Sequence, residues 1–316
     1  MKKSLGPIPP VIVVAGLRFR RRSGLARIAF TFAILAGLQG ACSEGTSGSK
    51  SLKQKGELPA RLVTLTPSST ELVLAVGAGD RLVGIDRFSA ELEEVGDLPK
   101  LPVVGDFLSP SFEAIARLEP DLVIADELQS KVAKGLEAAK LATLSLPMHR
   151  LDDVTRGLRS VGTALGRERE AAEAIGAIEE VLRESRARAS ARDHRARVLI
   201  VLDREPKTLA AMVAAGRGSF ADELLDVIGA ENVLSSAVRY PRISAEQILR
   251  GRPDIIIDAS PAAGESLDAW SRLAEVPAVA AGRVVPTQEP ALTTPSPRLA
   301  AALSELERVV YGSSPR

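Results

Sequence analysis

Two stretches of this chain carry the same pattern: SFEAIARLEPDLVIA at residues 111–125 and SAEQILRGRPDIIID at residues 244–258. They align without gaps, and in each a helical pattern stops at a Pro-Asp pair before an aliphatic run. Proline cannot continue a helix, so the pair ends the helix and begins a buried strand. A second pair follows in the same order, ELVLAVGA at 71–78 and ELLDVIGA at 223–230. The chain is therefore predicted to contain two homologous lobes.

Short aliphatic runs alternate with helical patterns in both lobes, which favours an α/β fold with mainly parallel sheets. In the first lobe strands are predicted at residues 61–65, 82–85, 103–104, 122–125 and 143–146, with a helix over 71–76. Between the lobes the chain is polar and helix-forming, and we expect a break at 162–166 before one long helix over 168–192. The predicted division is a leader (1–41), a linker (42–59), an N-terminal lobe (60–150), an interlobe helix (151–192) and a C-terminal lobe (193–316).

The leader has the composition of a secretory signal peptide. Residues 1–41 hold seven basic and no acidic residues, and the apolar run at 28–38 is too short to span a membrane. Small residues precede Cys42, the single cysteine, so the segment resembles a bacterial lipoprotein signal in which that cysteine is lipid-modified; Gln39 stands where the pattern prefers leucine. An ordinary signal peptide with an incidental cysteine is the alternative. Residues 43–56 are polar and predict a flexible tether.

Charge and composition exclude several classes of function. The whole chain has 41 Lys+Arg and 40 Asp+Glu, and removing the leader's seven basic residues leaves 34 against 40. A mildly acidic mature protein is not expected to bind nucleic acid. Only two histidines are present, which disfavours a zinc site. The chain lacks a phosphate loop and a dinucleotide fingerprint, and Ser219 does not fit the nucleophile-elbow pattern, so neither an enzyme nor a resident cofactor or metal is expected.

The order of lobe, long helix and similar lobe behind such a leader resembles the periplasmic solute-binding proteins of cobalamin and iron-siderophore importers. The stretches that carry this resemblance are RLVTLTPSSTE (61–71), GAGDRLVG (77–84), SPSFE (109–113), SFADELLDVIGAEN (219–232) and PSPR (295–298). The resemblance implies two Rossmann-like lobes joined by a helix, the class III fold, in a monomeric protein anchored by lipid in the periplasm or cell envelope. It also implies a ligand held between the lobes and delivered to the permease dimer of an ABC transporter.

In this family an acidic residue on the first helix of each lobe engages arginines of the permease. Glu71 and Glu223 occupy matching positions in the repeat and are assigned that docking role, with Asp226 as a substitute for Glu223. The alternative is that both are ordinary exposed glutamates that favour the helix dipole.

The resemblance favours cobalamin as the ligand, because cobalamin-binding members carry aromatic residues on strand-end loops, where a flat apolar macrocycle can contact them. Phe112 and Phe220 are instead expected to face the core, because they fit the buried faces of helices. Asp106 is a candidate polar contact with the ligand. A ferric siderophore held by Arg87, Arg204, Arg217 and Arg239, or haem ligated by Tyr240 or His149, is the alternative. A sensor or adaptor on the same scaffold, or a hydrolase, is more remote. The predicted ligand contacts are Ser68, Phe88, Phe107, Asp126, Asp203, Arg204, Tyr240 and Gln288.

Overall fold

The computed structural model describes residues 57–96, 98–234, 238–264 and 267–312. The predicted signal peptide, Cys42 and the whole of the predicted tether, residues 43–56, lie outside these residues. None of the helices within them is both long and apolar enough to cross a membrane.

The N-terminal lobe is built on a parallel four-stranded sheet in the order β2-β1-β3-β4. The register places Leu62 beside Leu82 on one side and Leu122 on the other. Instead of the strand predicted at 103–104, the chain makes a single bridge between Ile85 and Val103. The elements are β1 (Leu62–Thr64), α1 (Pro67–Ala75), η1 (Gly79–Arg81), β2 (Leu82–Gly84), η2 (Ser89–Glu91), α2 (Glu93–Gly96), α3 (Phe112–Arg117), β3 (Leu122–Asp126), η3 (Glu127–Gln129), α4 (Ser130–Ala138) and β4 (Thr143–Leu146).

The C-terminal lobe repeats this order. Its sheet runs β6-β5-β8-β9, with β7 also paired to β5, and all pairings are parallel except that of β5 with β6. The elements are β5 (Arg197–Asp203), β6 (Val213–Ala214), α7 (Phe220–Val227), β7 (Glu231–Asn232), α8 (Ala245–Gly251), β8 (Ile255–Asp258), η4 (Leu267–Leu273), α9 (Pro277–Ala280), β9 (Val284–Pro286), η5 (Pro290–Leu292) and α10 (Leu299–Tyr311).

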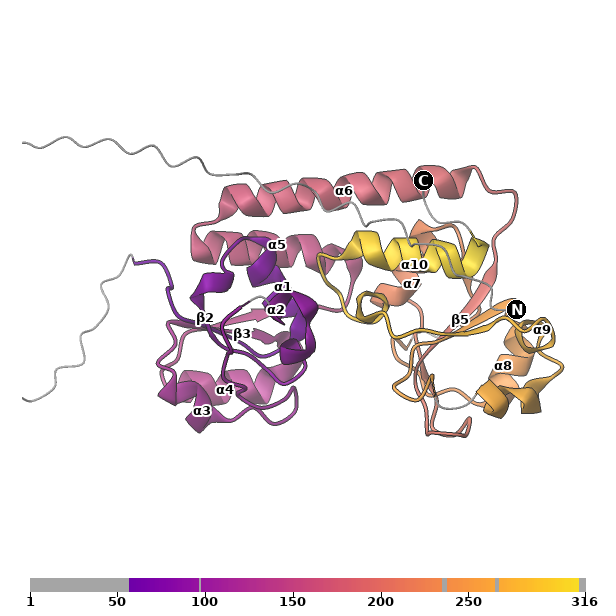
Figure 1. Cartoon of the computed structure of the whole chain (residues 1–316), viewed down its shortest axis with the longest axis horizontal. Helices are drawn as coiled ribbons and strands as arrows, with labels where there is room; N and C mark the ends of the chain where they lie inside the picture. The colour runs from indigo at the N-terminus through magenta and orange to yellow at the C-terminus, as the bar shows by residue number, and fades with distance from the viewer. Residues whose placement is uncertain (1–56, 97, 235–237, 265–266, 313–316) are drawn as a thin grey trace, which may run out of the picture. The chain divides into compact units, whose positions relative to one another are not determined.

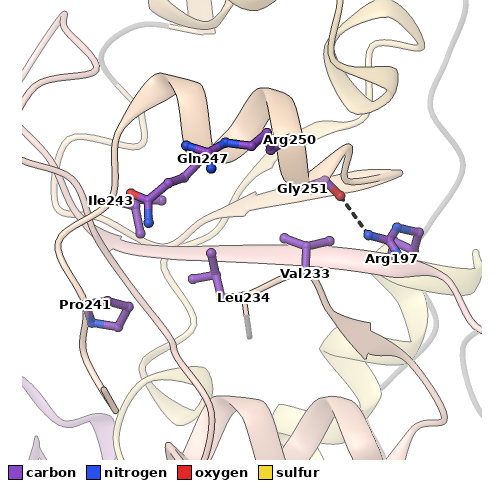
Figure 2. A pocket seen from close by; sticks show the side chains of 8 residues that line it. All are labelled: Arg197, Val233, Leu234, Pro241, Ile243, Gln247, Arg250 and Gly251. Atoms are coloured by element: carbon purple, nitrogen blue, oxygen red, sulfur yellow. Dashed lines mark hydrogen bonds between the residues drawn. The ribbon is translucent and has the colours of Figure 1, made fainter. Parts of the chain in front are cut away.

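The aspartate of the Pro-Asp pair makes the same kind of hydrogen bond in both lobes. One oxygen of Asp121 accepts a hydrogen bond from the backbone N–H of Arg61 at 3.0 Å, and one oxygen of Asp254 accepts from Arg197 at 3.0 Å. The side chain of Arg197 then donates to the carbonyl of Gly251 at 2.9 Å, at the edge of a surface pocket beside α8 (Figure 2). Each repeat motif therefore ties the end of a helix to the first strand of its own lobe.

Two antiparallel helices, α5 (Leu151–Leu165) and α6 (Glu168–Ser190), follow the first sheet, and α6 passes beside α5 and α10 (Figure 1). The break predicted from residue 162 onward begins later, at Gly166, which caps α5 with a φ of 65°. Gly162 lies within α5, and a Cβ there would lie 2.6 Å from the Cβ of Ala171 on α6. That glycine serves the close approach of the two helices rather than a turn.

One apolar core is shared by the helices of both lobes. It includes Leu72 of α1, Leu158 of α5, Ile178 of α6, Leu224 of α7 and Leu303 of α10. Separate clusters fill the opposite face of each sheet. The lobes are thus joined by packing as well as by the chain itself.

The two phenylalanines expected in helix cores differ. Phe220 is buried, as predicted. Phe112 is partly exposed, because its ring lies against Gly135 at the surface of α4, where a Cβ would be 2.7 Å from the ring. The core prediction for Phe112 is therefore wrong.

Candidate functional site

The loops that follow β2 and β3 meet at the carboxyl edge of the first sheet. The N–H of Arg87 donates to the carbonyl of Gly105 at 2.8 Å, which joins the loop after β2 to the segment after the Val103 bridge. The side-chain amide of Gln129 donates to the carbonyl of Phe107 at 2.8 Å, which joins that segment to the turn after β3. This edge is where parallel α/β sheets bind ligands.

Large apolar side chains are exposed on these loops. Phe88 is 43% exposed, with the Arg87 guanidinium 4.8 Å from its ring centre, and Leu108 is 84% exposed. Leu128 and, in the C-terminal lobe, Val238 and Tyr240 are also exposed, whereas Phe107 is half-buried. Exposed apolar groups that gather on loops mark binding surfaces.

The sequence predictions included the exposed aromatic residues Phe88 and Tyr240, but no aliphatic residue of these loops was among the predicted contacts. The signal that would have found Leu108, Leu128 and Val238 is an aliphatic residue placed in a polar strand-end loop.

Carboxylates line the same edge of the N-terminal lobe. Asp126 is buried, and its Oδ1 accepts from the N–H of Leu128 at 2.8 Å. The Nε2 atom of His149 lies 3.4 Å from Asp126 Oδ1 and 3.5 Å from Glu127 Oε1. Burial is the largest cause that raises the pKa of Asp126, and it outweighs the opposing effects of the Leu128 hydrogen bond and His149. This edge is acidic rather than basic.

Tyr240 of the C-terminal lobe lies within electrostatic reach of that edge. Its pKa is raised above the usual 10.0, first by burial and then by the Asp126 carboxylate, against the lowering effect of Arg239. The Asp126 carboxylate of one lobe thus contributes to the electrostatic environment of the Tyr240 phenol in the other lobe.

Arg204 differs from its predicted role as a ligand contact. Its Nε lies 2.8 Å from Asp258 Oδ2, both side chains are fully buried, and a further nitrogen donates to the carbonyl of Ala262 at 3.0 Å. Asp258 also accepts from the Ser260 hydroxyl at 2.6 Å and from the indole of Trp270 at 3.2 Å. The guanidinium is used inside the lobe, so Arg204 is a structural residue.

The other polar residues predicted to contact the ligand differ in their exposure to solvent. Asp203 and Gln288 are exposed at the strand ends of the C-terminal lobe, and the Gln288 amide lies 3.5 Å from the carbonyl of Ser260. Ser68 is buried in the first turn of α1.

The two glutamates assigned to docking are engaged within the protein. The side chain of Glu71 is 3% exposed, and its Oε1 lies 2.6 Å from an Arg298 nitrogen. The side chain of Glu223 is 19% exposed and lies 2.7 Å from an Arg150 nitrogen. Neither matches the freely exposed carboxylate that the docking prediction assumed, although the substitute Asp226 is exposed beside Arg195.

A second matched pair of glutamates is exposed instead. Glu113 and Glu246 stand opposite each other in the repeat, in the first turns of α3 and α8, with side chains 83% and 77% exposed. Each glutamate forms an ion pair with the arginine four residues further on. The nitrogen–oxygen distance is 3.7 Å for Arg117 and Glu113, and 3.0 Å for Arg250 and Glu246. The alignment of the two repeats already paired them, but sequence reasoning selected the other matched pair.

Asp86 yields a pH-dependent prediction. Burial raises its pKa above the usual 3.8 in spite of the hydrogen bond from Ser89, so folding favours the neutral acid and stability falls as pH rises through the folded-state pKa. Asp86→Asn keeps an oxygen for the N–H of Ser89 and removes the buried charge. We expect it to raise the free energy of unfolding by about 1 kcal/mol at pH 7, which is about 2–4 °C in Tm.

Below pH 3.8 the gain from Asp86→Asn should vanish, because the native aspartate is then neutral as well. Thermal unfolding followed by circular dichroism at both pH values checks this. A gain of equal size at both would contradict the electrostatic cause.

The geometry now defines a class of protein: two similar α/β lobes bridged by a helix, with apolar and polar side chains exposed at their strand ends. The family model of the periplasmic binding proteins matches residues 62–291, and the chain belongs to that family. Its fold is the class III fold, with two Rossmann-like lobes joined by a long helix.

Known relatives agree with this placement. The chain is 28% identical over 263 residues to YvrC of Bacillus subtilis (strain 168), an uncharacterised ABC transporter substrate-binding lipoprotein, with 80% of each chain covered. It is 27% identical over 267 residues to the vitamin B12-binding protein of Pectobacterium carotovorum, covering 82% of this chain and 91% of that one. A solved haem-binding protein of Pseudomonas aeruginosa superposes with a TM-score of 0.69 at 27% identity, covering 82% and 95%.

The protein is therefore a substrate-binding component of an ABC importer, located in the periplasm or cell envelope. Proteins of this family are non-enzymatic transport components that deliver a small ligand to a membrane permease.

Proposed function

We propose that this protein captures cobalamin between the strand-end edges of its two lobes. The observation that carries the proposal is the set of exposed apolar side chains on those edges, with Phe88 and Leu108 in one lobe and Tyr240 in the other. Such groups suit the apolar face of a large ring. The carboxylates of Asp126 and Glu127 can accept hydrogen bonds from peripheral amide groups. A vitamin B12-binding protein is among the relatives.

An anionic ferric siderophore fits less well. Of the four arginines that could form a basic pocket, Arg204 is buried in its ion pair with Asp258. Arg87 lies over the Phe88 ring on an edge that also carries Asp106 and Asp126. Carboxylates on this edge repel an anionic ligand.

Haem is the second candidate, because a haem-binding protein is a structural neighbour and Tyr240 is exposed. One feature opposes the other proposed axial ligand. The Nε2 atom of His149 is buried, 3.4 Å from Asp126 Oδ1 and 3.5 Å from Glu127 Oε1, so it is not open to an iron centre.

Calorimetric titration of the mature protein with cyanocobalamin, haemin and a ferric siderophore tests the ligand. We expect binding of cyanocobalamin, and we expect Phe88→Ala and Tyr240→Ala each to weaken it about 10-fold, which is about 1.4 kcal/mol of lost ring contact. Phe112→Ala removes a ring of similar exposure, 42%, on α3 away from the strand-end loops, and serves as a control that should leave the affinity unchanged. Tighter binding of haemin or the siderophore than of cyanocobalamin would overturn the proposal.

For delivery, we propose that Glu113 and Glu246 meet the permease dimer. They are exposed, they are related by the internal repeat, and a pseudo-twofold pair of carboxylates can face arginines of a twofold partner. The assignment replaces Glu71 and Glu223, which are engaged in ion pairs within the protein.

We further propose that the leader is removed, that Cys42 carries a lipid anchor and that the protein acts as a monomer. The leader and the anchor are supported by the sequence pattern before Cys42 and the lipoprotein name of one relative, and the monomer is what the resemblance to the family implies. Cells fed labelled palmitate should incorporate the label into the native protein. Incorporation into the Cys42→Ser variant would contradict the proposed lipid attachment at Cys42.

A further inference from the structure

Two ion pairs cross between the lobes in opposite directions. The last strand of each sheet is followed by a helix, α5 after β4 and α10 after β9, and an arginine precedes each helix. Arg150 of the N-terminal lobe reaches Glu223 on α7, and Arg298 of the C-terminal lobe reaches Glu71 on α1. The four residues therefore repeat with the lobes: each lobe supplies one arginine and one glutamate.

The pair of Arg150 and Glu223 includes a helix terminus. Oε1 of Glu223 lies 2.8 Å from Nε and 2.7 Å from a terminal nitrogen of Arg150. Its Oε2 accepts the N–H of Leu151, the first residue of α5, at 2.6 Å. The carboxylate of one lobe thus satisfies a terminal donor of the other lobe's helix and lies at the positive end of its dipole. Among these contacts the arginine side chain is the most exposed group, at 53%.

The pair of Arg298 and Glu71 is more enclosed. The contact is 2.6 Å, and the side chains are 27% and 3% exposed. Solvent and salt screen such a pair less than the outer one. If the lobes moved apart, the buried carboxylate of Glu71 would lose the arginine that neutralises it. Leaving a buried charge without its partner is energetically unfavourable.

We propose that Arg150, Glu223, Arg298 and Glu71 are positioning residues that fix the spacing between the two strand-end edges. The shared core through α1, α5, α6, α7 and α10 supports the same rigid arrangement. The ligand is then captured at a preset spacing, without closure of the lobes. The spacing itself does not depend on which ligand is bound, although its use in capture rests on the proposed function.

The test measures the distance between the lobes directly. Spin labels on Ala138→Cys at the end of α4 and Ala280→Cys at the end of α9, in a Cys42→Ser background, report that distance by pulsed electron resonance. We expect one narrow distribution, unchanged by cyanocobalamin. Changing all four charged residues to glutamine should broaden it and weaken cyanocobalamin binding about 10-fold, as expected when the competent spacing is populated roughly a tenth of the time.

Two further variants make the result decisive. Arg150→Gln/Glu223→Gln keeps the enclosed pair and should broaden the distribution less, which tests the proposal even if the fourfold variant does not fold. Arg169→Gln/Glu173→Gln removes a pair of similar length, 3.1 Å, within α6 alone, and should change nothing. If the variants of the crossed pairs match this control, the proposal is wrong. The distance between the lobes can be measured without any ligand. The result can therefore be interpreted even if the protein does not bind cobalamin.

Discussion

Asp258→Ala is expected to lower the free energy of unfolding by about 3–5 kcal/mol, because it leaves a buried cation without its partner. Arg204 and Asp258 are both fully buried, and their contact is 2.8 Å. The Ser260 hydroxyl and the Trp270 indole also donate to the Asp258 carboxylate. The backbone N–H of Ser260 donates as well, at 3.2 Å, so one substitution removes the acceptor of four donors at once, and each unsatisfied buried donor has its own cost.

Urea unfolding followed by Trp270 fluorescence measures the effect. Arg204→Met/Asp258→Leu should recover most of the loss, since replacing a buried ion pair by apolar groups of similar size is often neutral. Glu173→Ala, which breaks the exposed pair with Arg169, is the matched control and should cost less than about 1 kcal/mol. A loss for Asp258→Ala no larger than this control would refute the structural role given to the buried pair.

The two-lobed fold could be predicted because the repeat consists of short-range sequence signals that act within a few residues. The Pro-Asp pair stops a helix wherever it stands, and in both lobes its aspartate accepts the N–H that begins the first strand. On α6, Ile175, Ile178 and Leu182 stand at helical spacing in the sequence, and all three are buried.

The site was predicted less well, because burial and ion pairing depend on which segments meet. Arg204 follows a strand like a ligand residue, yet Asp258, 54 positions away, holds it inside the lobe. Glu71 and Glu223 occupy ordinary first-helix positions, and only the path of the chain brings Arg298 and Arg150 to them. The alignment of the repeats matches both pairs of glutamates, and only the folded structure shows that Glu113 and Glu246 are the exposed pair.

Glu113→Arg/Glu246→Arg is expected to reduce cobalamin uptake on the order of 100-fold while leaving ligand affinity unchanged. Each reversal replaces an attraction to permease arginines by a repulsion, and a loss of about 1.4 kcal/mol at each of two related sites is tenfold per site. Uptake of labelled cyanocobalamin is measured in cells that lack the native copy of the protein, and affinity is measured by calorimetry on the purified variant.

A matched control separates docking from net charge. Glu173→Arg/Glu179→Arg makes the same charge change on the exposed face of α6 and should leave uptake near the native level. A fall in uptake of equal size in both variants would show that bulk charge governs the encounter. Native uptake with both Glu113 and Glu246 reversed would exclude them from docking and return the role to Glu223 or Asp226. Because rim charges act mainly on association, the defect should deepen at low salt and shrink as salt screens the repulsion.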